Sequence, residues 1–379
     1  MTCDSGAPFY EFFAGGGLAR LGLQPDFACA FANDIDPAKA RAYAAAFDGE
    51  EIAIGDIWRL ATSDLPGQAA LAWASFPCQD LSLAGARRGL AAPRSGAFWG
   101  FHRLIEKLAA EKRAPDILAL ENVRGLLSSH GGADFTALVH ALDGLGYRVG
   151  AVEIDAAHFT PQSRPRLFIT AARQAPGALT MAGPSEPFHT PALRDVVARL
   201  PEPLRKRFVW WRLPVPPKRN TRLADMLDDD ANVAWNSDEQ TGRLLSQMSA
   251  MQRARVDALR EGAKREVGAV FRRIRVERGE RIQRAEARFD GLAGCLRTPS
   301  GGSSRQMLVF VEGDKTRSRL VSPREAARLM GVPDHYPLPA NQNAALHLLG
   351  DAVCVPAVRW LARHVLVPLA GANATRMSA

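Results

Sequence analysis

The chain has 379 residues, of which 47% are apolar and 23% charged, which suits one large domain with a second module and excludes global disorder. Its five cysteines are far apart and form no CxxC or Cys/His cluster, which argues against a disulfide framework and structural zinc. The segment 205–288 holds 20 Lys and Arg against 12 Asp and Glu, and therefore carries the whole net charge of +8. Such a region is typical of nucleic-acid binding, although a solvated helical face gives the same pattern.

No apolar run approaches the roughly 20 residues that span a bilayer. The first ten residues, MTCDSGAPFY, lack an apolar signal region. We therefore expect an intracellular, cytoplasmic protein that has no membrane partner and binds no metal.

The first 170 residues alternate short apolar runs with helical patterns. FYEFFA precedes GGG and LARLGL, FACAFA precedes NDID, LAWASF precedes PCQ, and DILALE, YRVGAVEID and RLFITAA follow. This order predicts an α/β fold, a Rossmann-like, doubly wound and mostly parallel sheet. Residues 172–220 are irregular and rich in proline, which predicts a connection into a different module. Helical character returns from about residue 320.

Residues suited to a ligand follow the first three predicted strands. Gly15 to Gly17 come after the first strand and let the backbone approach a cofactor at a helix N-terminus. Asp34 ends the second strand, where an acidic residue commonly accepts hydrogen bonds from ribose hydroxyls, and Asp56 follows the third. Taken alone, the glycines could serve only a tightly packed turn, and an acidic residue could serve only as a helix N-cap. Ligand-suited residues at three successive strand ends together favour an adenosine-type cofactor.

Reactive residues follow the next strands. Cys78 comes directly after the apolar run LAWASF, at the place where open α/β sheets carry out chemistry. Glu121 emerges from the apolar strand LALENV, which predicts a raised pKa and a proton donor. Arg164 and Arg166 are two residues apart at a strand start, so both can point to one face and bind a base edge or phosphate. Buried filler and ion pairs are the alternatives.

The ordered set FAGGG, NDID, GDI, PCQ, ENV, QSRPR, RLVSPREAARLMGVPD and GDAVCVPAV resembles the C5 DNA cytosine methyltransferase family. These motifs extend from residue 11 to about residue 360. The resemblance implies S-adenosylmethionine as cofactor, and Cys78, Glu121, Arg164 and Arg166 as the catalytic residues. The implied cofactor contacts are Phe13, Gly15, Gly17, Asp34, Asp56, Ile57, Pro77 and Asp351.

The resemblance also implies double-stranded DNA as the partner and a cytosine turned out of the duplex. The basic segment falls where the family carries its target-recognition region. The expected DNA contacts are Gln79, Ser82, Arg272, Arg273, Arg275, Ser303, Ser304 and Arg305. We expect residues 1–185 to form the first part of a catalytic domain, 186–337 a smaller, irregular target-recognition domain, and 338–379 a segment that completes the catalytic domain.

The chain departs from the family pattern at the C-terminal GN pair, which is Gly350–Asp351 here. Asp351 adds negative charge where the family has asparagine, which predicts altered cofactor affinity, and a helix N-cap is the alternative. A transfer-RNA cytosine methyltransferase and a catalytically silent DNA-binding regulator are the rival functions. We expect a monomer on DNA, with a restriction or phage-defence system as its setting.

Overall fold

The computed structural model describes residues 6–77, 96–262, 264–277, 279–299 and 305–377. The chain forms two compact units. The first unit contains Met1–Asp155, Pro165–Pro217 and Val353–Ala379, and the second contains Ala156–Arg164 and Lys218–Ala352. The first unit is therefore discontinuous, and its last segment returns after the second unit is complete.

The first unit is built around a seven-stranded sheet in the order β3-β2-β1-β4-β5-β7-β6. The strands β1 to β5 are parallel to one another, and β7 is antiparallel to both of its neighbours, β5 and β6. This confirms the mostly parallel, doubly wound sheet. The strands are β1 (Ala7–Phe12), β2 (Phe27–Asp34), β3 (Ile52–Ile54), β4 (Leu71–Ala74), β5 (Ile117–Val123), β6 (Arg148–Asp155) and β7 (Pro165–Ala172).

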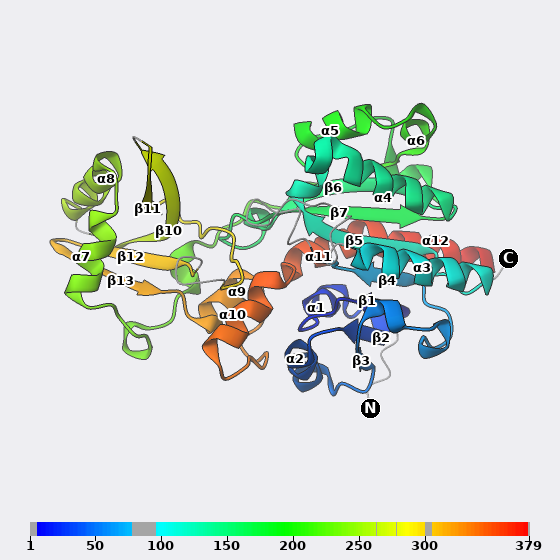
Figure 1. Ribbon diagram of the computed structural model, residues 1–379, viewed down its shortest axis with the longest axis horizontal. Helices are drawn as coiled ribbons and strands as arrows, with labels where there is room; N and C mark the ends of the chain where they lie inside the picture. Colours follow the sequence, from blue (N-terminus) through cyan, green and yellow to red (C-terminus); the bar gives the residue numbers. More distant parts are fainter. Residues whose placement is uncertain (1–5, 78–95, 263, 278, 300–304, 378–379) are drawn as a thin grey trace. The chain divides into compact units, whose positions relative to one another are not determined.

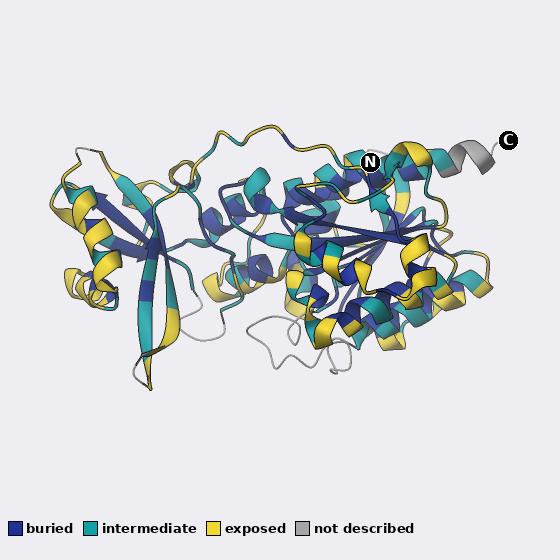
Figure 2. Ribbon diagram, turned by 90° about the horizontal axis from the view of Figure 1, so that it is seen from above, coloured by how far each residue is buried: buried dark blue, intermediate teal, exposed yellow. Residues whose placement is uncertain are grey.

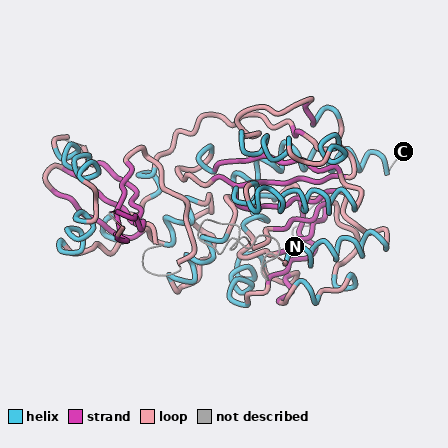
Figure 3. Tube along the Cα trace, turned by 45° about the horizontal axis from the view of Figure 1, so that its top comes forward, coloured by secondary structure: helices cyan, strands magenta, loops and turns pink. Residues whose placement is uncertain are grey.

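Helices cover both faces of this sheet (Figures 1 and 3). One face packs through a large apolar cluster against α3 (Ala97–Ala110), α4 (Ala133–Gly144) and α5 (Pro191–Ala198). Arg359 on α11 donates a hydrogen bond to the Leu21 carbonyl oxygen on α1 at 2.7 Å and so joins these two helices. The remaining helices of this unit are α1 (Leu18–Leu23), α2 (Pro37–Phe47), α6 (Glu202–Arg207), α11 (Val355–Leu361) and α12 (Val367–Met377).

The proline-rich stretch after β7 belongs to the first unit. We expected a domain boundary after residue 185, but the unit continues to Pro217. Leu193 and Val196 on α5 join the core cluster, and the Val209 amide donates to the Val149 carbonyl oxygen at 2.8 Å. A short ladder joins β8 (Thr180–Met181) to β9 (Trp210–Trp211). The apolar residues between the prolines therefore extend the core of the first unit. The high proline content of this stretch had indicated an irregular connection instead.

The second unit contains a four-stranded antiparallel sheet in the order β11-β10-β12-β13. Two helices pack on it through a separate apolar cluster that includes Leu244, Val256 and Val309. This unit is more regular than the sequence predicted. Its elements are α7 (Asp238–Ser246), α8 (Ala250–Arg260), β10 (Glu266–Glu277), β11 (Glu280–Arg288), β12 (Met307–Glu312), β13 (Lys315–Leu320), α9 (Pro323–Leu329) and α10 (Gln342–Asp351).

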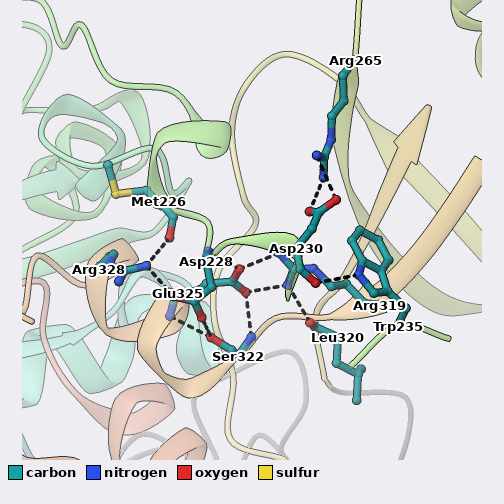
Figure 4. A network of polar contacts seen from close by, with 10 residues as sticks. All are labelled: Met226, Asp228, Asp230, Trp235, Arg265, Arg319, Leu320, Ser322, Glu325 and Arg328. Atoms are coloured by element: carbon teal, nitrogen blue, oxygen red, sulfur yellow. Dashed lines mark hydrogen bonds and ion pairs between the residues drawn. The ribbon is translucent and has the colours of Figure 1, made fainter. Parts of the chain in front are cut away.

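A buried ion pair fixes the start of α9 to β13 (Figure 4). Arg319 donates to both carboxylate oxygens of Glu325, at 2.8 and 2.6 Å, and both side chains are almost fully buried. Glu325 also accepts hydrogen bonds from the Ser322 and Asp228 amides. The paired charges and the four hydrogen bonds to the carboxylate offset part of the cost of burying the two ions, and Arg319 Nε is left without a hydrogen-bond partner among the described residues.

The stretch Gln342–Ala372 is long and apolar enough by composition to cross a membrane. However, 56% of its most apolar window is buried inside the protein, and α10 and α11 are separate helices. These features are typical of core helices.

Candidate active site

The five parallel strands bring their carboxyl ends to one edge of the sheet, which we call the carboxyl edge. The polar segments predicted from the sequence follow these strand ends. The described residues at this edge are Phe13, Gly15 and Gly17 after β1, Asp34 at the end of β2, Asp56 and Ile57 after β3, Pro77 after β4, and Glu121 near the end of β5.

The loop after β1 has a backbone that ordinary side chains rarely adopt. Phe13 has a φ of 58°, which is unusual for an aromatic residue and is a strained conformation of the kind found at functional sites. Gly17 has a φ of 75°, and a Cβ atom there would lie 2.3 Å from the ring of Phe47. A glycine is therefore required at this position both for its conformation and for packing against α2.

Asp34 ties this loop to the end of β2. Its Oδ2 accepts a hydrogen bond from the Gly15 amide at 2.8 Å, and its Oδ1 accepts one from the Asp36 amide at 2.8 Å. The side chain is buried, so its observed contacts are with the backbone. A ribose contact by Asp34 stays a prediction, and it would have to use the remaining lone pairs of these two oxygens.

Asp56 and Ile57 begin a short 3₁₀ helix, Ile57–Arg59. Asp56 accepts from the Trp58 amide at 3.0 Å through Oδ1, which leaves Oδ2 without a partner among the described residues. The Ile57 side chain is only 3% exposed and packs in the core cluster. Any contact between this residue and a cofactor would therefore have to come from its backbone.

Ile35 is a candidate site residue that the sequence motifs did not identify. This side chain directly follows Asp34 at the carboxyl edge and is 64% exposed, which is high for a large apolar residue. Trp58, two residues after Asp56, is 45% exposed. Each of the two predicted polar contacts, Asp34 and Asp56, thus has a large apolar residue close to it in the sequence. This pattern could have predicted an apolar surface that binds a flat ring.

Glu121 and Arg166 lie together. In the β5–β7 pair Val123 is opposite Arg166, and because side chains alternate along a strand, Glu121 and Arg166 project from the same face. Arg166 Nε lies 3.2 Å from Glu121 Oε1, and both side chains are largely buried. The structure thus brings together two of the four residues that we predicted to be catalytic.

Asn122, the middle residue of ENV, holds the segment that leads to the predicted nucleophile. Its Nδ2 donates to the Phe76 carbonyl oxygen at 3.3 Å, while its Oδ1 accepts from the Val123 amide at 2.8 Å. Pro77 is the last described residue of this segment. Cys78, Gln79 and Ser82 lie outside the described residues, and so do Ser303 and Ser304.

Arg164 makes different contacts from Arg166. Its side chain is 1% exposed, and its guanidinium donates to the carbonyl oxygens of Leu296 at 2.8 Å, Gly350 at 3.0 Å and Ala352 at 2.6 Å. We expected both arginines to point to one face and bind one group. Instead, Arg164 joins backbone segments of the second unit, because carbonyl groups left over at the end of α10 need donors. A catalytic role for Arg164 stays a prediction.

Asp351 is exposed and is the last residue of α10. The N-cap of the following helix is Cys354, so the alternative explanation of Asp351 as an N-cap was wrong. A carboxylate at a helix C-terminus meets the negative end of the helix dipole, which costs some stability.

Glu11 lies in the middle of the sheet, two residues before Phe13. Its side chain is fully buried, and neither carboxylate oxygen has a hydrogen-bond partner among the described residues. Burial raises its pKa from 4.5 to about 8, against the opposing effect of the nearby Arg20 guanidinium. At neutral pH this side chain is therefore mostly protonated.

The described residues among the predicted DNA contacts of the second unit are exposed or half-buried. Arg273 and Arg275 are exposed on β10, and Arg272 is half-buried on the same strand. Glu286 on β11 forms ion pairs with Arg273, at 3.8 Å, and with Arg275. Arg305 donates to Asn343 at 2.6 Å.

A cavity of about 910 Å³ in the first unit lies between α3, α4 and α6. Its lining includes Trp99, His102, His130 and His140 but none of the predicted site residues. We therefore do not assign it to the active site. In the described ranges, no group of three or more His, Cys, Asp and Glu side chains could hold a metal ion.

A family profile described as C-5 cytosine-specific DNA methylase matches residues 8–366. The chain belongs to this family. It is 26% identical to the type II methyltransferase M.NlaX of Neisseria lactamica over 96% of this chain and 97% of that protein. It is 24% identical to the type II methyltransferase M.HhaI of Haemophilus parahaemolyticus over 95% of this chain and 94% of that protein. The resemblance stated from the motifs is thereby confirmed.

Solved structures share the fold. The methyltransferase EhMeth of Entamoeba histolytica aligns with a TM-score of 0.63 at 13% identity, over 96% of this chain and 99% of that one. The S. pombe Dnmt2 methyltransferase aligns with a TM-score of 0.59 at 17% identity, also over 96% and 99%. The chain is thus an enzyme of the cytosine-C5 DNA methyltransferase family with the expected α/β architecture.

Proposed function

We propose that this protein is a sequence-specific DNA (cytosine-5)-methyltransferase that uses S-adenosylmethionine and the thiolate of Cys78. The observation that carries the proposal is the arrangement at the carboxyl edge. Arg166 Nε lies 3.2 Å from Oε1 of the buried Glu121, and the neighbouring Asn122 donates to the carbonyl oxygen of Phe76, which precedes Cys78 by two residues in the sequence.

The carboxyl edge fits the cofactor. At Gly15 the loop has no side chain, and no described atom apart from those of its chain neighbours lies within 4 Å of the place a Cβ atom would take. Asp56 Oδ2, which has no partner among the described residues, can accept from an adenine amino group, and Ile35 offers an exposed apolar surface to a ring. S-adenosylmethionine, when bound, supplies the methyl group. Asp34 would hold the glycine loop in place through its bond to the Gly15 amide.

The need for a cysteine follows from the chemistry of cytosine. C5 of the ring is too electron-poor to attack a methyl group directly. Addition of the Cys78 thiolate to C6 turns C5 into an enamine-like carbon nucleophile. After C5 has taken the methyl group, loss of the C5 proton and expulsion of the thiolate restore the aromatic ring and release the enzyme.

Glu121 and Arg166 serve the same step. Thiolate addition places negative charge on the ring, and a proton or hydrogen bond from Glu121 at N3 offsets it. Arg166, held against Glu121, can donate to the O2 atom of the same ring. Arg164 would act as a positioning residue, because its guanidinium is committed to backbone carbonyl oxygens.

The substrate must expose C6, which is inaccessible inside a duplex. We propose that the enzyme turns the cytosine out of the helix, which costs a few kcal/mol of unstacking. Phosphate contacts from the basic segment 205–288 would offset this cost. By analogy with type II methyltransferases, we place the protein in a bacterial cell beside a restriction or defence system.

The test is transfer of a labelled methyl group from S-adenosylmethionine to duplex DNA, with transfer RNA assayed in parallel and Cys78→Ala as the control. We expect label in DNA from the wild type and none from the variant. Label in RNA alone would replace the proposal with a transfer-RNA methyltransferase, and label in neither would favour a silent DNA-binding protein.

A further inference from the structure

Glu11 is a buried carboxyl group close to the loop after β1. Its side chain is 1% exposed, and neither carboxyl oxygen has a hydrogen-bond partner among the described residues. Figure 2 shows the strands at the centre of the first unit in dark blue, the colour of buried residues. Phe13, which begins the loop, follows Glu11 by two positions, a distance of about 7 Å along a strand.

The surroundings of Glu11 contain more acidic groups than basic ones. The titratable and charged side chains near it are Arg20 on α1, Tyr43 on α2, and Cys29 and Asp34 on β2, and Glu51 pairs with Arg20 from the turn before β3. Arg20 donates to the Tyr43 hydroxyl at 3.0 Å and forms an ion pair with Glu51. One guanidinium group therefore faces three carboxyl groups.

Glu11 is the member of this cluster whose charge changes near neutral pH. Burial raises the pKa of Cys29 to about 12 and raises the pKa of Tyr43 above its ordinary value, so both stay protonated. Burial also raises the pKa of Glu11 to about 8. A positive charge that arrives near Glu11 would favour its ionised form.

The cofactor loop lies within electrostatic range of this carboxyl group. Asp34 accepts a hydrogen bond from the Gly15 amide of the loop, and its negative charge contributes to the raised pKa of Glu11. A positive charge bound at the same loop acts on Glu11 with the opposite sign, and charges in a protein interior are weakly screened. S-adenosylmethionine carries a sulfonium and an ammonium group against one carboxylate, so its net charge is positive.

We propose that Glu11 is a positioning residue for the cofactor, which releases its proton to the solvent when S-adenosylmethionine binds and then stabilises the positive charge of the bound molecule. Only the O–H bond of the carboxyl group breaks, so the step needs no other reactant. The inference rests on the proposed function, and it predicts that the cofactor binds more tightly as pH rises.

A purely structural role of Glu11 predicts a different outcome. Arg20 Nε also has no hydrogen-bond partner among the described residues, so a small shift could pair it with Glu11. A Glu11 paired in this way would already be ionised before the cofactor arrives and would release no proton. The number of protons released on binding therefore separates the two roles.

The experiment is isothermal titration calorimetry of S-adenosylmethionine into the full-length protein at pH 7.5. Titrations in phosphate and in Tris, which differ in ionisation enthalpy, give the number of protons released. The wild type is compared with Glu11→Gln and with Glu153→Gln. Glu153 is the matched control, because it is a buried glutamate whose pKa burial also raises, and it lies on β6 at the far edge of the sheet.

We expect the wild type and Glu153→Gln to release about 0.5 proton more per bound cofactor than Glu11→Gln. This corresponds to a fall of about one unit in the pKa of Glu11, from its value of about 8 in the free protein. Over pH 6.5 to 8.5 the affinity of the wild type should rise about sixfold relative to Glu11→Gln. The amino group of the cofactor titrates near pH 8, but it contributes equally to all three proteins.

Equal proton release by the wild type and Glu11→Gln overturns the proposal. Infrared difference spectroscopy provides a second test that needs no variant, because the band of a protonated carboxyl group should disappear when the cofactor binds to the wild type. A band that persists overturns the proposal. Denaturant unfolding checks that each variant is folded.

Failure of the proposed function would have a different signature. If the wild type binds no S-adenosylmethionine at any pH, both the proposed function and this inference are contradicted. If the cofactor binds but the proton release does not depend on Glu11, the inference alone is contradicted.

Discussion

The carboxyl edge of the first unit and the outer part of the β10–β11 hairpin of the second unit present their side chains in opposite ways. We call this outer part, residues 271–277 and 279–286, the ribbon. At the edge, Asp34 and Asn122 are buried and their side chains are bonded to backbone groups. On the ribbon, Ile274 and Val276 are exposed in solvent. The protein itself therefore holds the side chains of the edge in place through hydrogen bonds, whereas packing does not hold these exposed side chains.

The largest expected effect is at the carboxyl edge. Glu121→Gln keeps the size of the side chain and an acceptor for Arg166, but it removes the carboxylic proton donor. We expect kcat for methyl transfer to fall by about 10²–10⁴-fold, with little change in DNA affinity.

Glu106→Gln, an exposed position on α3, serves as the control. Steady-state kinetics on duplex DNA makes the measurement. A raised KM with an unchanged kcat would show that Glu121 contributes only to substrate binding. The carboxyl edge would then not differ from the ribbon in the way we describe.

The sequence predicted the carboxyl edge well because strand topology alone determines which residues meet there. Apolar runs that end in Gly, Asp, Cys or Glu define strand ends, and parallel strands collect those ends at one edge. That Glu121 and Arg166 lie together agrees with the family resemblance, which implied that both are catalytic, whereas the ion pair between them was only the alternative explanation of each residue.

Other features could not be predicted because they depend on distant contacts. Arg164 and Arg166 have the same chemistry and are two residues apart. What distinguishes Arg164 is its hydrogen bonds to the carbonyl oxygens of Leu296, Gly350 and Ala352, which are distant in the sequence. The ribbon was also hidden, because its arginines interleave with glutamates in a pattern that equally suits a helix.

The second prediction concerns the buried ion pair that supports the sheet of the second unit. Arg319→Met leaves Glu325 buried without its counter-charge, so we expect the free energy of unfolding to fall by about 3–5 kcal/mol. The exposed pair of Arg243 and Glu239 is the control, where Arg243→Met is expected to cost less than about 1 kcal/mol. Urea denaturation compares the two, and equal losses would contradict the account.

The third prediction concerns Glu11 beneath the carboxyl edge. Its folded-state pKa of about 8 exceeds the ordinary 4.5, so between these pH values the folded protein holds a proton that the unfolded chain has lost. Stability should therefore fall as pH rises across this interval, by up to about 1.4 kcal/mol per pH unit.

Glu11→Gln removes this titration. The variant should gain stability relative to the wild type as pH rises from 5 to 8, as measured by denaturant unfolding at each pH. Parallel stability curves for the two proteins would show that the carboxyl group is ionised in the folded state.

The smallest expected effect is at a single ribbon charge. Arg275→Gln should weaken binding to all DNA sequences alike and should reduce the slope of log K against log salt concentration by about 1. Lys107→Gln on α3 is the control, since Lys107 is exposed and lies outside the basic segment 205–288. A change in the preferred sequence instead of the salt slope would assign base reading to Arg275.

The central claim, attack of Cys78 on cytosine in DNA, is tested most directly by covalent trapping. Duplex DNA in which 5-fluorocytosine replaces cytosine is incubated with the protein and S-adenosylmethionine, because a fluorine at C5 cannot leave as a proton and so prevents release of the thiolate. We predict a complex that survives denaturing electrophoresis with the wild type and is absent with Cys78→Ala. No complex with the wild type, or an equal complex with Cys78→Ala, would contradict the mechanism.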